Sequence, residues 1–335
     1  MIMPALSNQE QMDYLQKVSR TFALTIPMLR KELGDVISNA YLHFRIIDTV
    51  EDEIIDDDSD KVDLLRTMGS FYQGDSQDLG ELDGLKERIL NLINHDQSRA
   101  EYRLIGDYIR LCKRTIGYGP DVYKDIFRCA SIMSNGMASS IERGQNRSQN
   151  DVDRYCYFVA GVVGQLLARF FAAGIKDPEK AREVFYLSVS FGEGLQLVNI
   201  LKDRFTDKNR GSYFLPYDGQ DIDDDEVVDK YVRICMGHLD NAVRLISLLG
   251  KKQGDIRLFC LINVAMAYAT LYKIYRHRMP PKINRHQVWR LLAASRICAQ
   301  SNTLLFIFKR YLSRNLPSMS VDFRELSDRV SLWKD

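Results

Sequence analysis

Apolar residues recur every three or four positions through most of this chain, which is the spacing of helices that bury one face. Residues 23–53 and 181–205 show this pattern most clearly, and no run alternates apolar and polar residues as a half-buried strand would. Breaks rich in turn-forming residues fall at 72–84, 115–121, 207–226 and 277–286. No linker, repeat or low-complexity segment separates the helices. The pattern therefore predicts a single all-α domain over residues 1–335, built as a large helical bundle.

Two segments are apolar enough to raise the question of a membrane. Residues 155–175 are interrupted by Gln165 and Arg169, so they fall short of the roughly 20 clean apolar residues of a membrane span and are interpreted as a buried helix. Residues 301–312, SNTLLFIFKRYL, are amphipathic. We interpret this second segment as a core helix, with transient membrane contact as the alternative.

Charge and cysteine content narrow the class of protein. Forty-six basic side chains against 45 acidic ones give a net charge of +1, which offers no bulk attraction for nucleic acid. The six cysteines are scattered singly, without the pairs of a zinc site or the density of a disulfide scaffold, which fits a reducing cytoplasm. The first residues have neither the basic nor the apolar region of a signal peptide.

A polar stripe runs along the predicted helix at residues 41–52. Tyr41, Arg45, Asp48 and Asp52 are spaced i, i+4, i+7 and i+11, so they share one face while apolar residues fill the other directions. This arrangement predicts that the stripe lies inside the bundle. Residues 56–60, DDDSD, have no apolar partners, and we expect a solvated loop whose carboxylates, including Asp57 and Asp58, face water.

A second stripe follows the same logic. Gln196, Asn199, Asp203 and Asp207 are spaced i, i+3, i+7 and i+11 and offer only oxygen atoms. Two such helices facing each other would form an oxygen cage suited to Mg²⁺, with coordination left open for a diphosphate. An exposed ion-pair ladder has the same spacing, so both readings stay open here. No histidine or cysteine shares the face of either stripe, and no GxxxxGK[ST] motif occurs, which disfavours zinc and a P-loop.

Five blocks of the sequence, in this order, resemble the squalene and phytoene synthase family. They are KVSRTFALTIPML (17–29), YLHFRIIDTVEDE (41–53), MSNGMASSI (133–141), YCYFVAGVVGQLLARFF (155–171) and LQLVNILKDRFTD (195–207). YCYFVAGVVG, together with VAMAYATLY (264–272) and PKINRHQV (281–288), is closer to squalene synthases than to phytoene synthases. The resemblance implies an isoprenoid synthase bundle with a central cavity.

The resemblance also implies an activity. Two farnesyl diphosphates would be condensed head to head through presqualene diphosphate, and NADPH would reduce the product to squalene. The alternatives are a relative that stops at presqualene diphosphate or makes dehydrosqualene or phytoene, and a non-catalytic relative used in assembly. Loss of metal ligands would be expected in the last case, and this chain retains Asp48, Asp52, Asp203 and Asp207.

Roles follow residue by residue from the same resemblance. It assigns Mg²⁺ to Asp48 and Asp52 of the first aspartate motif and to Asp203 and Asp207 of the second, and NADPH to the basic residues Lys282 and Arg285. It assigns diphosphate contacts to Ser19, Arg20, Tyr41, Arg45, Gln196, Asn199 and Lys202. Phe22 would line the cavity, and Tyr155 would steer proton removal during cyclopropane formation. For Tyr155 the alternative is a core tyrosine, and for Lys282 and Arg285 it is a basic surface loop.

Several positions depart from the family pattern. Thr206 stands where an acid is common, Lys202 stands where an arginine is common, and Asn284 replaces a basic residue. The arginine usually found two residues before the aromatic of the next loop is displaced to Arg210, with Ser212 in its place. The chain stops at SDRVSLWKD, where eukaryotic squalene synthases carry a membrane-anchoring helix. We therefore expect a monomeric cytoplasmic enzyme with peripheral membrane contact and no nucleic-acid partner.

Overall fold

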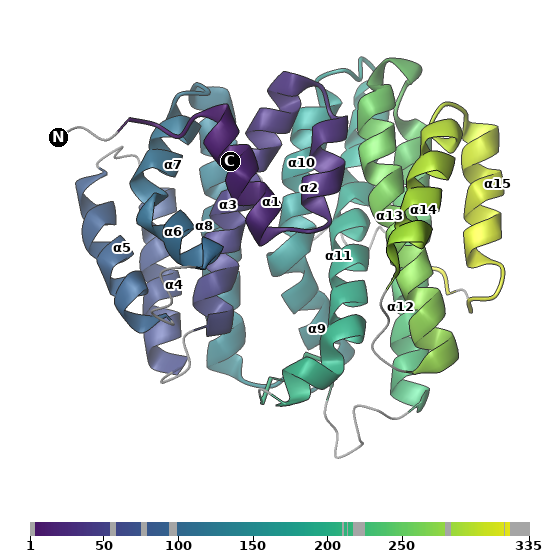
Figure 1. The fold of residues 1–335 in the computed structure, drawn as a ribbon. Helices are drawn as coiled ribbons and strands as arrows, with labels where there is room; N and C mark the ends of the chain where they lie inside the picture. Colours follow the sequence, from purple (N-terminus) through teal and green to yellow (C-terminus); the bar gives the residue numbers. More distant parts are fainter. Residues whose placement is uncertain are drawn as a thin grey trace. The chain divides into compact units, whose positions relative to one another are not determined.

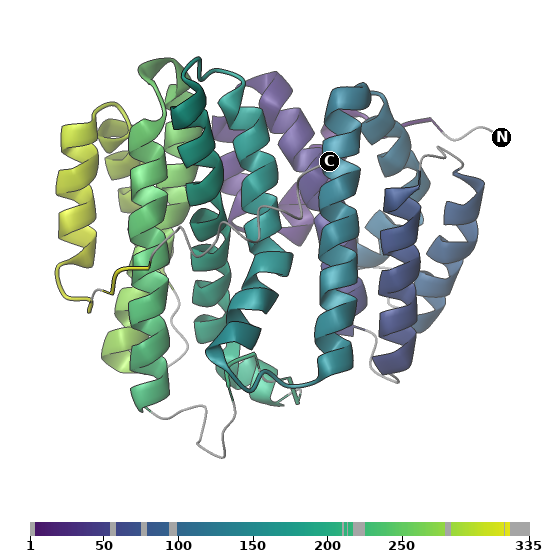
Figure 2. The same cartoon turned by 180° about the vertical axis from the view of Figure 1, so that it is seen from behind.

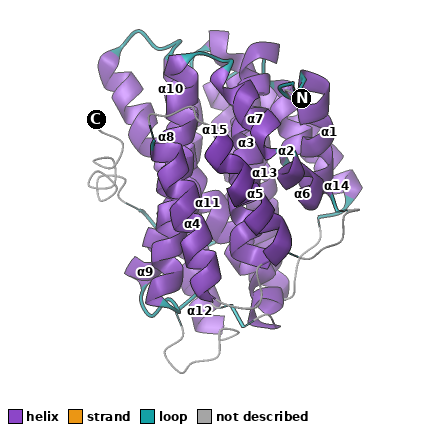
Figure 3. Ribbon diagram, turned by 90° about the vertical axis from the view of Figure 1, so that its left-hand side faces the viewer, coloured by secondary structure: helices purple, strands orange, loops and turns teal. Residues whose placement is uncertain are grey.

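Helices make up the regular structure of the described chain. The structure, a computed structural model, describes residues 4–53, 58–74, 79–93, 99–209, 211–212, 214–216, 225–278, 283–317 and 319–321. Over these residues no strand occurs, as Figure 3 shows, so the all-α expectation is confirmed. The chain divides into two compact units, Met1–Gly144 and Gln145–Asp335. The expectation of one domain stays a prediction.

The first unit is organised around its long third helix (Figure 1). Its helices are α1 (Asn8–Val18), α2 (Phe22–Thr25), the short 3₁₀ segment η1 (Ile26–Met28), α3 (Lys31–Glu53), α4 (Asp58–Gln73), α5 (Gly80–Leu92), α6 (Ala100–Gly106), α7 (Tyr108–Ile116) and α8 (Pro120–Arg143). Helix α3 contacts α1, α4, α6, α7 and α8. It can do so because Leu42, Ile46, Ile47 and Val50 are fully buried on its apolar faces.

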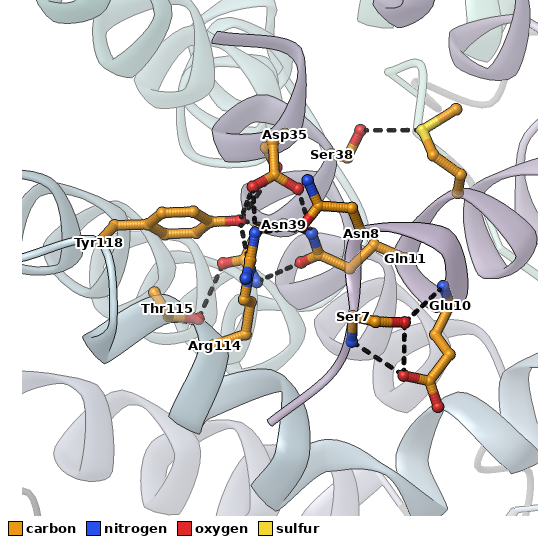
Figure 4. Close-up of polar contacts among 11 residues, drawn as sticks. Ser7, Asn8, Glu10, Gln11, Asp35, Ser38, Asn39, Arg114, Thr115 and Tyr118 are labelled. Atoms are coloured by element: carbon orange, nitrogen blue, oxygen red, sulfur yellow. Dashed lines mark hydrogen bonds and ion pairs between the residues drawn. The ribbon is translucent and has the colours of Figure 1, made fainter. Parts of the chain in front are cut away.

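A polar network holds α1, α3 and α7 together (Figure 4). The Gln11 amide on α1 donates to Asp35 Oδ1 at 2.7 Å, and the Asn39 amide donates back to Gln11 Oε1 at 2.7 Å. On α7, Arg114 is paired with Asp35 at 2.5 Å, and the Thr115 hydroxyl donates to Asn39 at 2.8 Å. Because buried polar groups are stabilising only when hydrogen-bonded, this network fixes the relative register of the three helices.

His43 lies in the same interior on α3. Its Nδ1 is 2.9 Å from the Tyr72 hydroxyl and its Nε2 is 2.7 Å from Thr115 Oγ1. The ring is fully buried, and this desolvation lowers the pKa of His43 to about 3. His43 is therefore neutral near pH 7 and acts as a hydrogen-bonded member of the core.

The second unit is built around α11. Its helices are α9 (Gln149–Cys156), the π-helical turn η2 (Tyr157–Gly161), α10 (Val162–Ala172), α11 (Pro178–Asn209), α12 (Asp225–Leu248), the 3₁₀ turn η3 (Lys251–Gln253), α13 (Gly254–His277), α14 (Arg285–Cys298) and α15 (Asn302–Ser313). Helix α11 contacts α9, α10, α12 and α13. Figure 2 shows α15, in yellow, at one edge of this unit beside the green helices.

Two glycines allow α10 and η2 to approach α11 closely. A Cβ at Gly164 would lie 2.0 Å from the carbonyl oxygen of Ser188, and a Cβ at Gly192 would lie 2.0 Å from that of Ala160. No other residue type fits such backbone contacts. The segment predicted as one buried helix at 155–175 is thus largely buried but is divided by the π turn, which periodicity did not reveal.

In the part of the chain that the structure describes, three helical stretches are long and apolar enough to cross a membrane by length and composition alone. They are Gln149–Ala172, Pro178–Asn209 and Lys251–His277, and 67–72% of each apolar window is buried inside the structure. Burial within the protein accounts for their composition, in agreement with the interpretation of 155–175 as a core segment.

Two sequence-based expectations are wrong. The first is the loop at 56–60: α4 begins at Asp58, where acidic side chains favour the positive end of the helix dipole. Asp58 is nevertheless exposed as expected, and Asp57 lies outside the described residues. The second is the core helix at 301–312: α15 buries only Leu305 and Phe308. It is a surface helix.

Candidate active site

The first stripe lies on α3, and its side chains become more exposed to solvent towards the end of the helix. Tyr41, Arg45 and Asp48 are partly buried, whereas Asp52, one turn further on, is exposed. The expectation of an interior stripe is therefore correct for its first three members only. Burial raises the pKa of Asp48 to about 7, the negative charge of Asp52 acts in the same direction, and Arg45 opposes it. At Asp48, desolvation therefore outweighs the opposing effect of Arg45.

Arg45 is fixed by a partner on another helix. Its Nη2 is 3.0 Å from Glu101 Oε1 on α6, and the two side chains are only 26% and 15% exposed. The Nε–H of Arg45 is buried and has no hydrogen-bond partner among the described residues. A buried guanidinium with a spare donor is suited to an incoming anion such as a diphosphate.

Residues from the end of α1 and from α2 meet Tyr41. Ser19 is buried directly after α1, and its Oγ accepts a hydrogen bond from the Phe22 amide at 3.1 Å. The Phe22 ring lies 5.1 Å from the Tyr41 ring, centroid to centroid. Burial raises the pKa of Tyr41, and a hydrogen bond with Ser19 acts in the opposite direction. Arg20 is exposed beside this group.

The second stripe lies near the end of α11 in a more open setting. Gln196, Asp203 and Asp207 are partly exposed, and Asn199 is exposed. Lys202 Nζ donates to Asn199 Oδ1 at 3.2 Å and pairs with Asp203 Oδ2 at 3.0 Å. The side chain of Asp203 is 48% exposed. Lys202 and solvent therefore stabilise the negative charge of Asp203.

Arg204, inside the second motif, has a structural position. It is buried, its Nη1 donates to the Leu201 carbonyl at 2.6 Å, and its Nη2 donates to the carbonyl of Arg278 at the end of α13. Arg278 itself pairs with Asp225 and Asp229 on α12. These contacts tie the end of α11 to the point where the chain leaves α13.

Tyr155 lies in the last turn of α9 and is 4% exposed. Its ring stacks on Phe214, with centroids 4.9 Å apart and planes 29° apart. The carbonyl of Phe214 accepts a 2.8 Å hydrogen bond from the Asn146 side chain, which fixes this loop beside the tyrosine. The structure thus gives Tyr155 an aromatic neighbour and a rigid setting.

The predicted NADPH residues are only partly described. Lys282 lies outside the described residues, as does the displaced Arg210. Arg285 is exposed in the first turn of α14. Asn284, which replaces a basic residue, caps this helix: its Oδ1 accepts from the Gln287 amide at 2.8 Å. Of the other departures, Thr206 and Ser212 are exposed.

The donor chemistry of each stripe fits Mg²⁺, although the stripes lie in different compact units. In the described part of the chain, no group of three or more His, Cys, Asp and Glu side chains is gathered closely enough to hold a metal. Each stripe instead offers a pair of carboxylates, Asp48 with Asp52 and Asp203 with Asp207. Hard oxygen ligands of this kind suit Mg²⁺, which usually takes one or two carboxylates plus substrate phosphates.

Sequence reasoning missed two residues of these clusters. Glu101 contacts Arg45 from 56 positions away, and no motif marks it. No motif marks Phe214 either: its ring stacks on Tyr155, and its carbonyl accepts a hydrogen bond from Asn146, 68 positions away. Both follow from tertiary packing, which spacing along one helix does not contain.

The sequence of this chain is similar to a known protein family and to curated proteins of that family. Residues 15–292 match the sequence model of the squalene/phytoene synthase family. Squalene synthase ERG9 of Candida albicans is 28% identical over 331 residues, covering 90% of this chain and 69% of that protein. Squalene synthase BSS of Botryococcus braunii is 33% identical over 198 residues, covering 59% of this chain and 40% of that protein. The chain thus spans from two fifths to just over two thirds of the length of these relatives.

Solved structures agree on the fold. A structure of TcSQS with the ligand BPH1237 matches 97% of this chain and 96% of that chain, with a TM-score of 0.74 and 22% identity. A dehydrosqualene synthase matches 87% of this chain with a TM-score of 0.56 and 18% identity. The family match covers residues 15–292 and includes both aspartate stripes, so this chain belongs to the squalene/phytoene synthase family.

Proposed function

We propose that this protein is a Mg²⁺-dependent squalene synthase. It would condense two farnesyl diphosphates into presqualene diphosphate, with release of one pyrophosphate and one proton. Presqualene diphosphate would then take up two electrons and a proton equivalent from NADPH and lose the second pyrophosphate to give squalene. The observation that carries the proposal is the α3 cluster, where the spare donor of Arg45 lies beside the pair Asp48 and Asp52 within a family match.

The residues of the first unit would bind and ionise an allylic diphosphate. Arg45 would donate to a diphosphate oxygen through its unpaired Nε–H, while Glu101 holds the guanidinium in place. Tyr41 neighbours Arg45, Ser19 is hydrogen-bonded to Tyr41, and the exposed Arg20 follows Ser19 in the chain. Asp48 and Asp52 would hold Mg²⁺, which when bound supplies positive charge to the leaving group. Phe22 and Tyr41 would present aromatic faces to the carbocation and exclude water from it.

The residues of the second unit would serve the second diphosphate and the proton. Asp203 and Asp207 would hold Mg²⁺, with Gln196, Asn199 and Lys202 donating to diphosphate oxygens. Tyr155 would accept or relay the proton lost on cyclopropane closure, with its ring held by Phe214. Lys282 and the exposed Arg285 would contact the phosphates of NADPH, which when bound supplies the reducing equivalents.

One experiment tests the proposal and separates it from its relatives. Purified protein is incubated with farnesyl diphosphate and Mg²⁺, with and without NADPH, and the lipids are identified by mass spectrometry. We expect squalene with NADPH, and presqualene diphosphate or unreduced rearrangement products without it. Identical products in both reactions would support a presqualene diphosphate, dehydrosqualene or phytoene synthase instead. Absence of pyrophosphate release in either reaction would support a non-catalytic relative.

A further inference from the structure

Helices α14 and α15 expose an unusual amount of apolar surface. Nine large hydrophobic residues are exposed in the described part of the chain, and six of them lie on these two helices: Trp289, Ile297, Leu304, Phe306, Ile307 and Tyr311. Trp289 is 65% exposed, and Ile297 and Ile307 are each 61% exposed. Scattered single apolar residues are normal on a surface, but a concentration on two neighbouring helices marks an interaction site.

The same part of the chain is strongly basic. Residues 256–321 contain eleven lysines and arginines and no aspartate or glutamate, although the whole chain carries nearly equal numbers of each charge. On the two helices, Arg290, Arg296 and Arg310 are exposed. Some of these cations are paired within the protein, as Lys309 is with Asp240, but the exposed arginines of α14 and α15 add positive charge to the segment that presents the apolar side chains.

Apolar and cationic side chains share the exposed stripes. On α14, Trp289 and Ile297 lie eight residues apart on one face, with Arg290 and Arg296 next to them. On α15, Ile307 and Tyr311 are adjacent along the helix, and Arg310 lies between them. This pattern, with apolar side chains and long cationic ones on the same exposed stripe, matches a surface helix that lies at a lipid interface.

The opposite face of α15 packs against the second unit. Leu305 and Phe308 are buried, and α15 contacts α12, α13 and α14 within the second unit. Lys309 pairs with Asp240 on α12 at 3.0 Å, which anchors the inner face. Figure 1 shows α15 at the edge of this unit beside α14. The outward side chains thus have no role in holding the helix in place.

We propose that α14 and α15 form a docking surface for an anionic lipid bilayer. Trp289 and Tyr311 would lie at the headgroup level, Ile297 and Ile307 would insert into the acyl boundary, and the arginines would pair with lipid phosphates. Charge complementarity selects this occupant over a second copy of the chain, because two copies joined through this face would bring like charges together. The proposal does not use the proposed reaction.

A fluorescence experiment reports on the surface directly. The chain has two tryptophans, so the full-length Trp333→Phe variant leaves Trp289 as the only reporter. It is mixed with phosphatidylcholine vesicles, with and without about one third phosphatidylglycerol. With the anionic vesicles we expect a blue shift of the Trp289 emission and quenching by brominated acyl chains. With neutral vesicles we expect neither change, because apolar insertion alone is weak without the electrostatic term.

Paired variants identify the side chains responsible. Arg290→Ala with Arg310→Ala should weaken binding to the anionic vesicles about 25-fold in cosedimentation, since each cation near such a surface contributes about a fivefold effect. The matched control, Lys251→Ala with Lys252→Ala, removes the same charge from exposed positions on η3 and should change binding less than twofold. Ile297→Ser with Ile307→Ser should weaken binding at least tenfold. Circular dichroism confirms that each variant is folded.

Three outcomes would overturn the proposal. The first is equal binding to neutral and anionic vesicles, or no binding to either. The second is an equal loss of binding in the Arg290/Arg310 and the Lys251/Lys252 variants, which would indicate net charge rather than this surface. The third is a dimer in analytical ultracentrifugation that dissociates in the Ile297/Ile307 variant while vesicle binding is absent, which would make the surface a contact between copies of the chain.

Discussion

The stripes on α3 and α11 each carry two aspartates four residues apart, but the electrostatic surroundings of those aspartates differ. On α3, Asp48 is desolvated enough for its pKa to rise to about 7, and Arg45 opposes this rise only in part. On α11, Asp203 is 48% exposed and Lys202 pairs with it directly. Spacing alone would have made the two stripes equivalent.

From this difference we expect the two stripes to depend unequally on a bound cation. A carboxylate in a low-dielectric position is stabilised strongly by a nearby positive charge, whereas an exposed, lysine-paired carboxylate gains less from the same charge. We therefore expect α3 to carry the larger share of the energy that stabilises the leaving diphosphate. The predictions below test this asymmetry, beginning with the largest expected effect.

The largest effect is expected from Asp48→Asn. The substitution keeps the side-chain size and removes a ligand charge from the less solvated stripe, so pyrophosphate release from farnesyl diphosphate should fall by about 10³ to 10⁴. The fold should survive, because the amide removes a charge that burial disfavours. Stopped-time pyrophosphate assays with saturating Mg²⁺ measure the rate. Asp58→Asn, at the exposed start of α4, is the control and should change the rate less than twofold.

A smaller effect is expected from Asp203→Asn, because solvent and Lys202 already surround this carboxylate. Pyrophosphate release should fall by about 10². The ratio between the two variants is the informative quantity. A loss in Asp203→Asn as large as that in Asp48→Asn, measured in the same assay, would break the asymmetry.

Glu101→Gln tests how far the α3 stripe depends on positioning. The guanidinium of Arg45 would lose its charged partner but keep a hydrogen-bond acceptor, so we expect about a tenfold rise in KM for farnesyl diphosphate with a smaller change in kcat. Glu142→Gln is the matched control: it breaks the pair with Arg66, in which the side chains are 39% and 48% exposed, and should leave both constants unchanged. Unchanged kinetics in Glu101→Gln would show that Glu101 does not position Arg45 for the reaction.

The smallest effect concerns the face of α3 behind the stripe. His43 has a folded pKa of about 3, below its unfolded value near 6.5, so the unfolded chain binds the extra proton. Its contribution to stability is complete above pH 6.5 and is lost as the pH falls from 6.5 towards 3, by about 1 kcal/mol per pH unit. Urea unfolding of the wild type and of His43→Gln between pH 7 and 4 measures the difference. Parallel loss of stability in the two proteins would contradict this assignment.

The helices and the two stripes could be predicted from the sequence because both depend on short-range periodicity. Tyr41, Arg45, Asp48 and Asp52 share a face by helix geometry alone, and the structure places them so. The ion pair between Arg45 and Glu101 could not be predicted from the sequence, because Glu101 reaches Arg45 only through the packing of α6 on α3. Residues 301–312 illustrate the opposite error: apolar content predicted burial, but one helix face can pack while the other stays exposed.

The π turn at Tyr157–Gly161 shows a further limit. Its residues are as apolar as those of the helices around it, and the break becomes visible only where η2 and α10 approach the backbone of α11 near Gly164 and Gly192. The partner helix determines where such close contacts occur. The sequence shows the glycines, but it does not show which backbone they contact.

The central claim is that one reaction, pyrophosphate release from farnesyl diphosphate, needs the carboxylates of both stripes, and a double-mutant cycle tests it most directly. Pyrophosphate release from farnesyl diphosphate is measured for the wild type, Asp48→Asn, Asp203→Asn and the double variant under one set of conditions. If both stripes serve the same rate-limiting step, their effects are strongly non-additive, and the double variant should be no more than about threefold slower than Asp48→Asn alone. If the losses multiply, so that the double variant is slower by the product of the two single effects, the stripes act independently and the claim that one step needs both is contradicted.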